Sequence, residues 1–167
     1  MPFNRPKIGL AALLFAISAS PALATDMPAC PATPQLPPEW AAWATPGPAP
    51  ADGVLSPNTA YEITLAPVAE VDLTGFDGKE LPEGSRGAVF KLAIPRDGIF
   101  RVTVANPMWI DLIGPDGVVE ASAHGHGPDC SGLGKIVDFP LKQGTYRLEF
   151  SAAEVLTSAV MVLGPTG

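Results

Sequence analysis

The two histidines of the chain lie two residues apart in a short glycine-rich segment. The segment reads Ala123-His-Gly-His-Gly-Pro-Asp-Cys130 and follows an expected strand. Because alternate residues of an extended chain point to the same side, His124 and His126 can present both imidazoles to one centre. Neutral imidazole is the commonest metal ligand and suits copper, zinc and iron. The spacing indicates a transition-metal site. The alternative is a loop whose histidines bond to backbone carbonyls.

A metal site needs further ligands, and several side chains compete for that role. Asp129, or Glu120 further upstream, would complete a two-histidine, one-carboxylate set of the kind that holds non-haem iron. Asp111 is a remote candidate that shares a strand face with Trp109, so we expect its carboxylate at the edge of the core. Cys130 could be a ligand only if it is not paired with another cysteine. In the metal-free alternative, a neighbouring amide would satisfy Asp111.

Cys30 and Cys130 are the only cysteines of the chain. In an oxidising compartment, an even number of cysteines indicates a disulfide. This bond would close a loop of about 100 residues, which corresponds to roughly 4 to 5 kcal/mol in the chain-entropy description. We expect it to fix an N-terminal arm to the body of the protein and to brace the histidine segment.

Two tryptophans form a second candidate site. The sequence Pro37-Pro-Glu-Trp40-Ala-Ala-Trp43 favours one short helical turn with both indoles on one face. Such a pair could be a stacking platform for a sugar or an aromatic ligand. Alternatively, Trp40 and Trp43 pack the arm against the domain, since tryptophan usually buries its large apolar ring.

The N-terminus has the pattern of a secretory signal peptide. Within residues 1–24, two basic residues precede an apolar run over 8–17, and the segment ends in Ala22-Leu-Ala24. The run is shorter than the roughly 20 residues that span a bilayer. We therefore expect a periplasmic or secreted protein without membrane insertion. A proline- and alanine-rich arm over 25–57 would precede a domain over 58–167.

Composition limits the partners of this mature chain. Both basic residues of the signal peptide would be removed, which leaves 8 Lys and Arg against 17 Asp and Glu, a net charge of −9. Such a surface repels phosphate backbones and anionic lipids. Nucleic acid is therefore a poor partner, whereas a metal ion or a small ligand remains compatible. The sequence leaves the oligomeric state open.

Hydrophobic periodicity predicts the fold class. Period-two alternation recurs in short segments separated by Gly, Pro, Asp and Asn, and no helical period of useful length is present. This pattern predicts a single antiparallel β-sandwich or jelly roll. The expected strands cover 61–65, 68–73, 89–94, 100–104, 108–113, 118–122, 135–141, 146–150 and 159–163.

An internal similarity supports this fold. An alternating segment enters a turn at Gly98, and a Gly-x-aromatic-Arg-aliphatic segment leaves it; the same arrangement surrounds Gly144. Both segments read as β-hairpins, and two copies are too few for a repeat array.

Taken with the histidine segment, Met108-Trp-Ile-Asp-Leu, Lys135-Ile-Val-Asp-Phe139 and Gly144-Thr-Tyr-Arg-Leu148 resemble small exported bacterial proteins labelled homogentisate 1,2-dioxygenase. The similarity covers most of the mature chain. It implies a non-haem iron enzyme that opens an aromatic ring with dioxygen. The enzyme of that name is a much larger cytoplasmic cupin with two histidines and a glutamate on iron.

Three hypotheses follow. The first is an exported β-sandwich binding protein that holds copper, zinc or iron through His124 and His126 without catalysis, because no placed general base is visible. The second is an iron dioxygenase that uses both histidines with Asp129 or Glu120. The third is a metal-free ligand-binding or structural sandwich with Trp40, Trp43 and Trp109 as apolar anchors.

Overall fold

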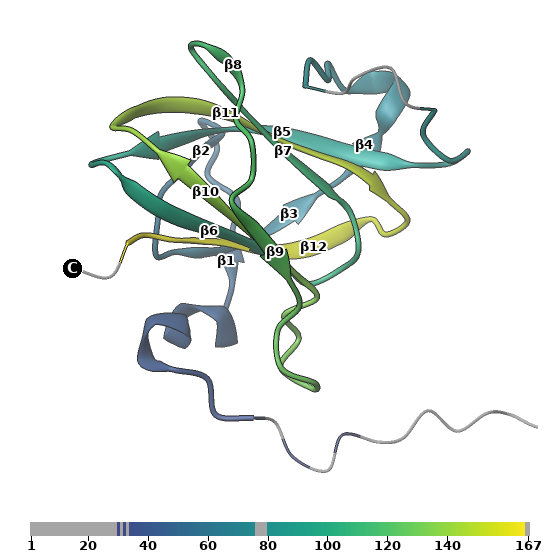
Figure 1. The fold of residues 1–167 in the computed structure, drawn as a ribbon. Helices are drawn as coiled ribbons and strands as arrows, with labels where there is room; N and C mark the ends of the chain where they lie inside the picture. Colours follow the sequence, from purple (N-terminus) through teal and green to yellow (C-terminus); the bar gives the residue numbers. More distant parts are fainter. Residues whose placement is uncertain (1–29, 31, 33, 76–79, 166–167) are drawn as a thin grey trace, which may run out of the picture.

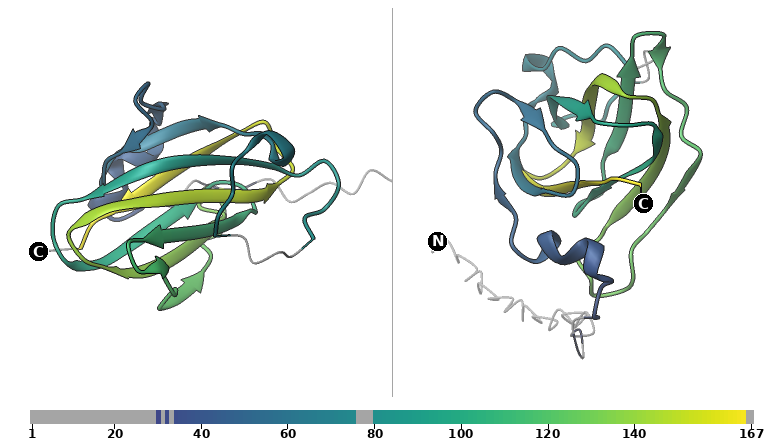
Figure 2. Two further views of the ribbon diagram at one scale, coloured as in Figure 1. Left: turned by 90° about the horizontal axis from the view of Figure 1, so that it is seen from above. Right: turned by 90° about the vertical axis from the view of Figure 1, so that its left-hand side faces the viewer.

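The alternating segments form two packed β-sheets in the computed structural model. The structure describes Cys30, Ala32 and residues 34–75 and 80–165. Sheet A contains, in spatial order, β1 (Gly47–Pro48), β3 (Ala60–Thr64), β12 (Thr157–Leu163), β6 (Gly98–Val104), β10 (Lys135–Leu141) and β9 (Ala123–Gly125). Sheet B contains β2 (Val54–Leu55), β5 (Arg86–Ile94), β11 (Gly144–Ala153), β7 (Trp109–Gly114) and β8 (Gly117–Val118), and β4 (Ala66–Pro67) also pairs with β5. The sheets lie face to face (Figures 1 and 2), so the predicted β-sandwich is confirmed.

Alternate residues of the long strands fill the space between the sheets. In sheet B, Leu148 lies in register between Phe90 and Leu112. In sheet A, Phe139 is opposite Phe100. Each such side chain removed from water stabilises the fold by about 1.5 to 3 kcal/mol. The residues that alternate with Leu148 therefore belong to the outer face of sheet B.

Most strand pairs are antiparallel, but two short pairs are parallel. β1 runs parallel to β3, and β2 runs parallel to β5. Both short strands come from the proline-rich arm and occupy the ends of their sheets. Proline has no N–H to donate, and a sheet edge tolerates that loss. The arm therefore adds an edge strand to each sheet, and the sheets are mixed rather than purely antiparallel.

The segments around Gly98 and Gly144 are not hairpins, and that prediction is wrong. β5 belongs to sheet B and β6 to sheet A, whereas β10 belongs to sheet A and β11 to sheet B. The two turns therefore carry the chain across the sandwich in opposite directions. β6 then pairs with β10, and β5 pairs with β11. The two similar segments thus pair with each other.

Two predicted strands are mostly replaced by other structure. Residues 68–73 contain the short 3₁₀ helix η2 (Val68–Glu70) and then an irregular segment. Within 118–122, only Val118 belongs to a strand. The irregular segment over 71–75 contacts the outer face of sheet B, where it contributes to the polar cluster described below.

The arm also supplies the 3₁₀ helix η1 (Pro38–Ala44), which lies at one end of the sandwich (Figure 2). Pro38 stands in its first turn, where a missing N–H is tolerated. The side chains of Trp40 and Trp43 are buried, with 6% and 8% of their surface exposed. They form a second apolar cluster with Ala60, Leu133, Met161 and Leu163. This cluster joins the arm to sheet A and to the loop after β9.

The predicted disulfide is confirmed. Cys30 is bonded to Cys130, and their Cα atoms are 5.7 Å apart. The bond joins the start of the arm to the loop between β9 and β10. Along the described ranges, the longest helix falls well short of an apolar membrane span. The predicted signal peptide over 1–24 lies outside the described residues.

Candidate functional site

The histidine segment forms edge strand β9 and an internally bonded loop. His124 is opposite Val137 of β10, and its ring is exposed. His126 follows the strand and is also exposed, and its Nδ1 lies 2.6 Å from the carbonyl oxygen of Gly134. Because a carbonyl oxygen only accepts, this contact places the proton on Nδ1. The other ring nitrogen, Nε2, then carries an available lone pair.

Close packing within this loop depends on Gly127. Its N–H donates to the carbonyl of Leu133 at 3.0 Å. A Cβ built on Gly127 would lie only 2.2 Å from the Cβ of Leu133. Leu133 in turn packs in the cluster that contains Trp40 and Trp43. The glycine therefore lets the loop close against the arm.

We expect Gly127→Ala to lower the free energy of unfolding by about 1 to 3 kcal/mol, because the added methyl overlaps Leu133. Gly125→Ala is the matched control, because nothing lies within 4 Å of a Cβ built there. Urea unfolding monitored by tryptophan fluorescence measures both. Equal effects of the two substitutions would contradict the packing described for this loop.

The structure does not bring the predicted metal ligands together. Asp129 and Glu120 are exposed in separate segments, and Cys130 is used by the disulfide. Asp111 lies on β7 of the other sheet. Across 34–75 and 80–165, with Cys30 and Ala32, no three or more His, Cys, Asp or Glu side chains gather as a metal would require. His124 and His126 are therefore two ligands at most in this arrangement.

Asp111 lies on the outer face of sheet B rather than at the edge of the core. It is opposite Glu149 in the register of β7 and β11. Trp109 shares its face, as predicted, and is 47% exposed. The ammonium of Lys135 lies 5.5 Å from the centroid of the Trp109 ring. Burial lowers the pKa of Lys135, and the nearby charge of Asp111 opposes that decrease.

Burial of Trp40 and Trp43 favours the packing interpretation over a stacking platform. Both rings contact the apolar cluster described above, and neither displays an open face in this conformation. Trp109 is the exposed tryptophan of the described chain, but Lys135 lies over its ring.

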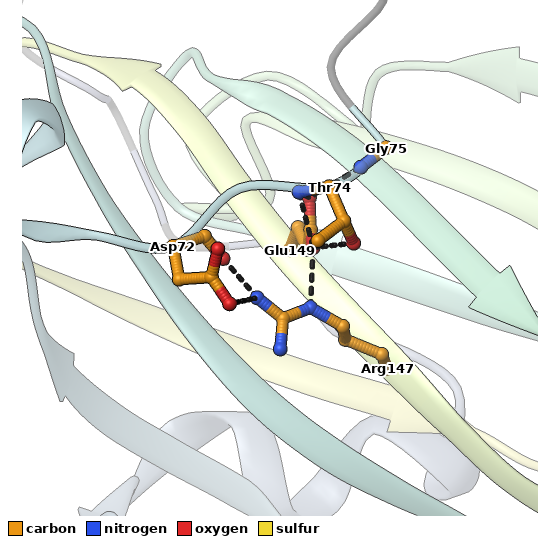
Figure 3. Close-up of polar contacts among 5 residues, drawn as sticks. All are labelled: Asp72, Thr74, Gly75, Arg147 and Glu149. Carbon is orange, nitrogen blue, oxygen red and sulfur yellow. Dashed lines mark hydrogen bonds and ion pairs between the residues drawn. The ribbon is translucent and has the colours of Figure 1, made fainter.

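A buried carboxylate organises the outer face of sheet B. Glu149 is 1% exposed although it points away from the core between the sheets. Its carboxylate accepts hydrogen bonds from the Thr74 N–H at 3.0 Å, the Thr74 hydroxyl at 2.8 Å and the Gly75 N–H at 2.9 Å. The Nε of Arg147 donates to it at 2.5 Å (Figure 3). The carboxylate thereby fixes the irregular segment to the sheet.

These bonds determine the charge of Glu149. Burial raises the pKa of its carboxyl group, but hydrogen bonds from Arg147, Gly75 and Thr74 lower it, and the net pKa lies below the ordinary value. Hydrogen bonds to the charged form favour that form. Glu149 is therefore an ionised, buried anchor.

Gly75 lets the segment approach β7 closely. A Cβ built on Gly75 would lie 2.9 Å from Cδ1 of Ile113 and 3.3 Å from Cβ of Asp111. A Cβ at this position would require the end of the Ile113 side chain to shift.

Arg147 connects this cluster to solvent. Its Nη2 donates to the backbone carbonyl of Asp72 and lies 3.3 Å from the Asp72 carboxylate. Its Nη1 makes no hydrogen bond with any described residue, as Figure 3 shows for the residues drawn. The side chain is 33% exposed. The neighbours of Arg147 thus hold its guanidinium in place while two N–H donors remain available.

Arg147 also lines a groove of about 1090 Å³. Lys91, Arg147 and Ile113 are directly opposite one another on β5, β11 and β7, and all three line the groove. The β7–β8 hairpin projects beyond the rest of its sheet (Figure 1) and supplies Val118 and Val119 to one wall. The turn before β11 supplies a further wall. The groove thus combines an apolar surface with cationic groups.

Sequence reasoning missed this region. Arg147 and Glu149 are two apart on one strand, and that spacing puts opposite charges on one face. The sequence shows this spacing of Arg147 and Glu149, but the sequence of the strand does not indicate that Glu149 is buried. Burial comes from residues 72–75, which lie far away in the sequence and partly within a segment predicted as a strand.

Comparison of the chain with models of known protein families, with curated proteins and with solved structures finds no match. The resemblance to the dioxygenase-labelled proteins stays a prediction. The fold and site define a disulfide-linked β-sandwich with a groove on the outer face of one sheet.

Proposed function

We propose that the protein is an exported binding protein that holds a small organic molecule in the groove on sheet B. The groove is the observation that carries this proposal. Its volume of about 1090 Å³ lies just above the range of about 300 to 1,000 Å³ that is usual for small-molecule sites. Such sites combine mostly apolar walls with a few placed polar groups. Val118, which is 58% exposed, would gain contacts from a ligand.

Export is supported by two independent features. The first 24 residues have the order of a signal peptide. The Cys30–Cys130 disulfide is of the kind that persists in oxidising compartments. The proposed ligand is therefore a molecule of the periplasm or the external medium.

Filling the groove tests this function. Thr145 is exposed, lies on β11 and lines the groove. We expect Thr145→Trp to abolish binding of small aromatic acids, amides and alcohols identified by an NMR screen of the wild type. Thr157→Trp is the matched control, because Thr157 is an exposed strand residue of sheet A that is not part of the groove. If both variants bind the screened molecules as the wild type does, the groove is not the site.

A transition metal ion at His124 and His126 is a second candidate function. One observation favours it: the Nδ1 contact with Gly134 fixes the tautomer of His126 and leaves Nε2 for a metal. The iron dioxygenase alternative also needs a carboxylate ligand, and neither Asp129 nor Glu120 accompanies both histidines. We therefore favour metal binding without catalysis at this loop.

Elemental analysis of protein isolated from its exported location tests the metal proposal. We expect near-stoichiometric copper or zinc in the wild type and none in the His124→Ala/His126→Ala variant. Equal metal contents in the two proteins would contradict it.

A further inference from the structure

We propose that the ligand of the groove carries a carboxylate, which Arg147 Nη1 and Lys91 bind at the groove floor. This inference rests on the proposed function and specifies the chemistry of its ligand. It begins from the register of β5 and β11, in which Lys91 and Arg147 are directly opposite each other on the outer face. Glu149 and Asp72 pair with Arg147, whereas Lys91 has no ion pair among the described residues. An anion bound between the two cations would give Lys91 a partner and would accept from the remaining N–H donors of Arg147.

The donors for such an anion are already oriented. Glu149 binds Nε of Arg147, and Asp72 binds Nη2, so the guanidinium plane is fixed before any ligand arrives. Nη1 has no hydrogen-bond partner among the described residues. Arginine binds carboxylates through paired N–H groups, and a pre-oriented donor loses little entropy on binding.

Two lysines extend this positive site. Lys91 and Lys142 are exposed, line the groove and form no ion pair within the part of the chain that the structure describes. The acids of the lining are Asp52 and Asp116. Asp52 accepts a hydrogen bond from Val54, and Asp116 lies in the turn of the β7–β8 hairpin. The lining thus holds three cations against two acids, and the anionic group is expected beside the cations.

The apolar end determines the rest of the ligand. Ile113, Val118 and Val119 line the groove on the side of β7 and β8. A molecule with an aromatic or aliphatic body and one carboxylate would match both ends. In an acidic protein with 17 Asp and Glu against 10 Lys and Arg, a site that accepts an anion requires such local donors.

Indole-3-acetate and indole-3-acetamide are matched probes for this proposal, because they differ only in the charged group. We expect the acid to bind the wild type about ten- to a hundredfold more tightly than the amide, because it adds hydrogen bonds with charged donors. Both affinities are measured by NMR titration, with the shifted amides assigned to residues.

Lys91→Met/Lys142→Met tests the site without touching the Glu149 anchor. This variant should lose the preference for the acid. Arg96→Met/Arg101→Met removes the same net charge outside the groove and should keep the preference. Arg147→Lys retains a cation beside Glu149 but removes Nη1, and it should also weaken binding of the acid.

The outcomes separate the two proposals. Equal binding of acid and amide within the groove would overturn the carboxylate inference and leave the proposed function standing. Equal loss of acid binding in both double variants would also overturn it, because net charge alone would then explain binding. Absence of groove shifts with either probe, and with every molecule of the NMR screen, would overturn both proposals.

Discussion

Replacement of Glu149 by glutamine is expected to lower the free energy of unfolding at neutral pH by about 2 to 4 kcal/mol. The buried carboxylate accepts hydrogen bonds from Thr74, Gly75 and Arg147. Glutamine has the size of glutamate, but one carboxylate oxygen is replaced by an NH₂ group. That group cannot accept hydrogen bonds, so some of the N–H and O–H donors around position 149 lose their acceptor. Breaking a buried ion pair by changing one partner has effects of this size. Urea unfolding of the two proteins measures the difference.

The same anchor predicts how stability depends on pH. Since the pKa of Glu149 is lowered in the folded protein, the native state favours its charged form. This stabilisation is complete above the unfolded-state pKa of about 4.3 and is lost as the pH falls through the lower folded-state pKa. The gap in stability between the wild type and Glu149→Gln should therefore narrow below about pH 4.3.

Glu62→Gln is the control for both measurements, because Glu62 is an exposed glutamate on β3. It should change stability by less than about 0.5 kcal/mol, as is usual for surface positions. A Glu149→Gln protein as stable as this control at neutral pH would mean that the anchor does not stabilise the sheet.

Loss of the disulfide is the second large effect. We expect Cys30→Ser/Cys130→Ser to lower the free energy of unfolding by about 2 to 5 kcal/mol, because the bond closes a long loop in the unfolded chain. The two cysteines are 100 residues apart. Urea unfolding of the variant and of the reduced wild type should give similar losses. An unchanged midpoint in both would contradict the stabilising role.

The disulfide variant should also loosen the arm locally. Trp40 and Trp43 pack against Leu133, which follows Cys130 in the same loop. Without the bond, the arm is retained by this apolar contact, by the contact of Ala49 with the main core and by the edge strands β1 and β2. Amide hydrogen exchange in η1 should therefore accelerate more than exchange in β11, the central strand of sheet B.

The sequence predicted the sandwich because apolar and polar residues alternate in its long strands. Residues 135–141 and 146–150 show this clearly, and both lie within strands. Alternation does not show which strands pair with each other, however. The segments around Gly98 and Gly144 were therefore interpreted as hairpins, although they connect the two sheets. Residues 68–73 alternate too, but they cover a sheet instead of joining it.

The disulfide was predicted correctly because the number of cysteines limits the possible pairings. Two cysteines in one chain have one intramolecular pairing, and that pairing is present. The number of histidines does not limit the choice of further metal ligands in the same way. Such ligands can come from distant segments, and whether they lie near the histidines depends on the tertiary arrangement. Asp111 shows the difficulty: its face was predicted, but the sheet and side on which that face lies depend on the order of strands.

The burial of Glu149 and the orientation of Arg147 were beyond local reasoning for a similar physical reason. Glu149 is enclosed by Thr74 and Gly75, which are 75 and 74 residues away in the chain. The groove likewise combines residues of β5, β7, β8 and β11. Its surface exists only after the two sheets have formed.

A map of backbone amide shifts in the wild type on addition of indole-3-acetate is the most direct test of the groove as a binding site. Binding there predicts saturable shifts that cluster at Lys91, Ile113, Val118 and Arg147, on four strands of sheet B. Shifts that cluster instead around His124 or η1, or shifts that do not saturate, would contradict a carboxylate-binding groove on this sheet.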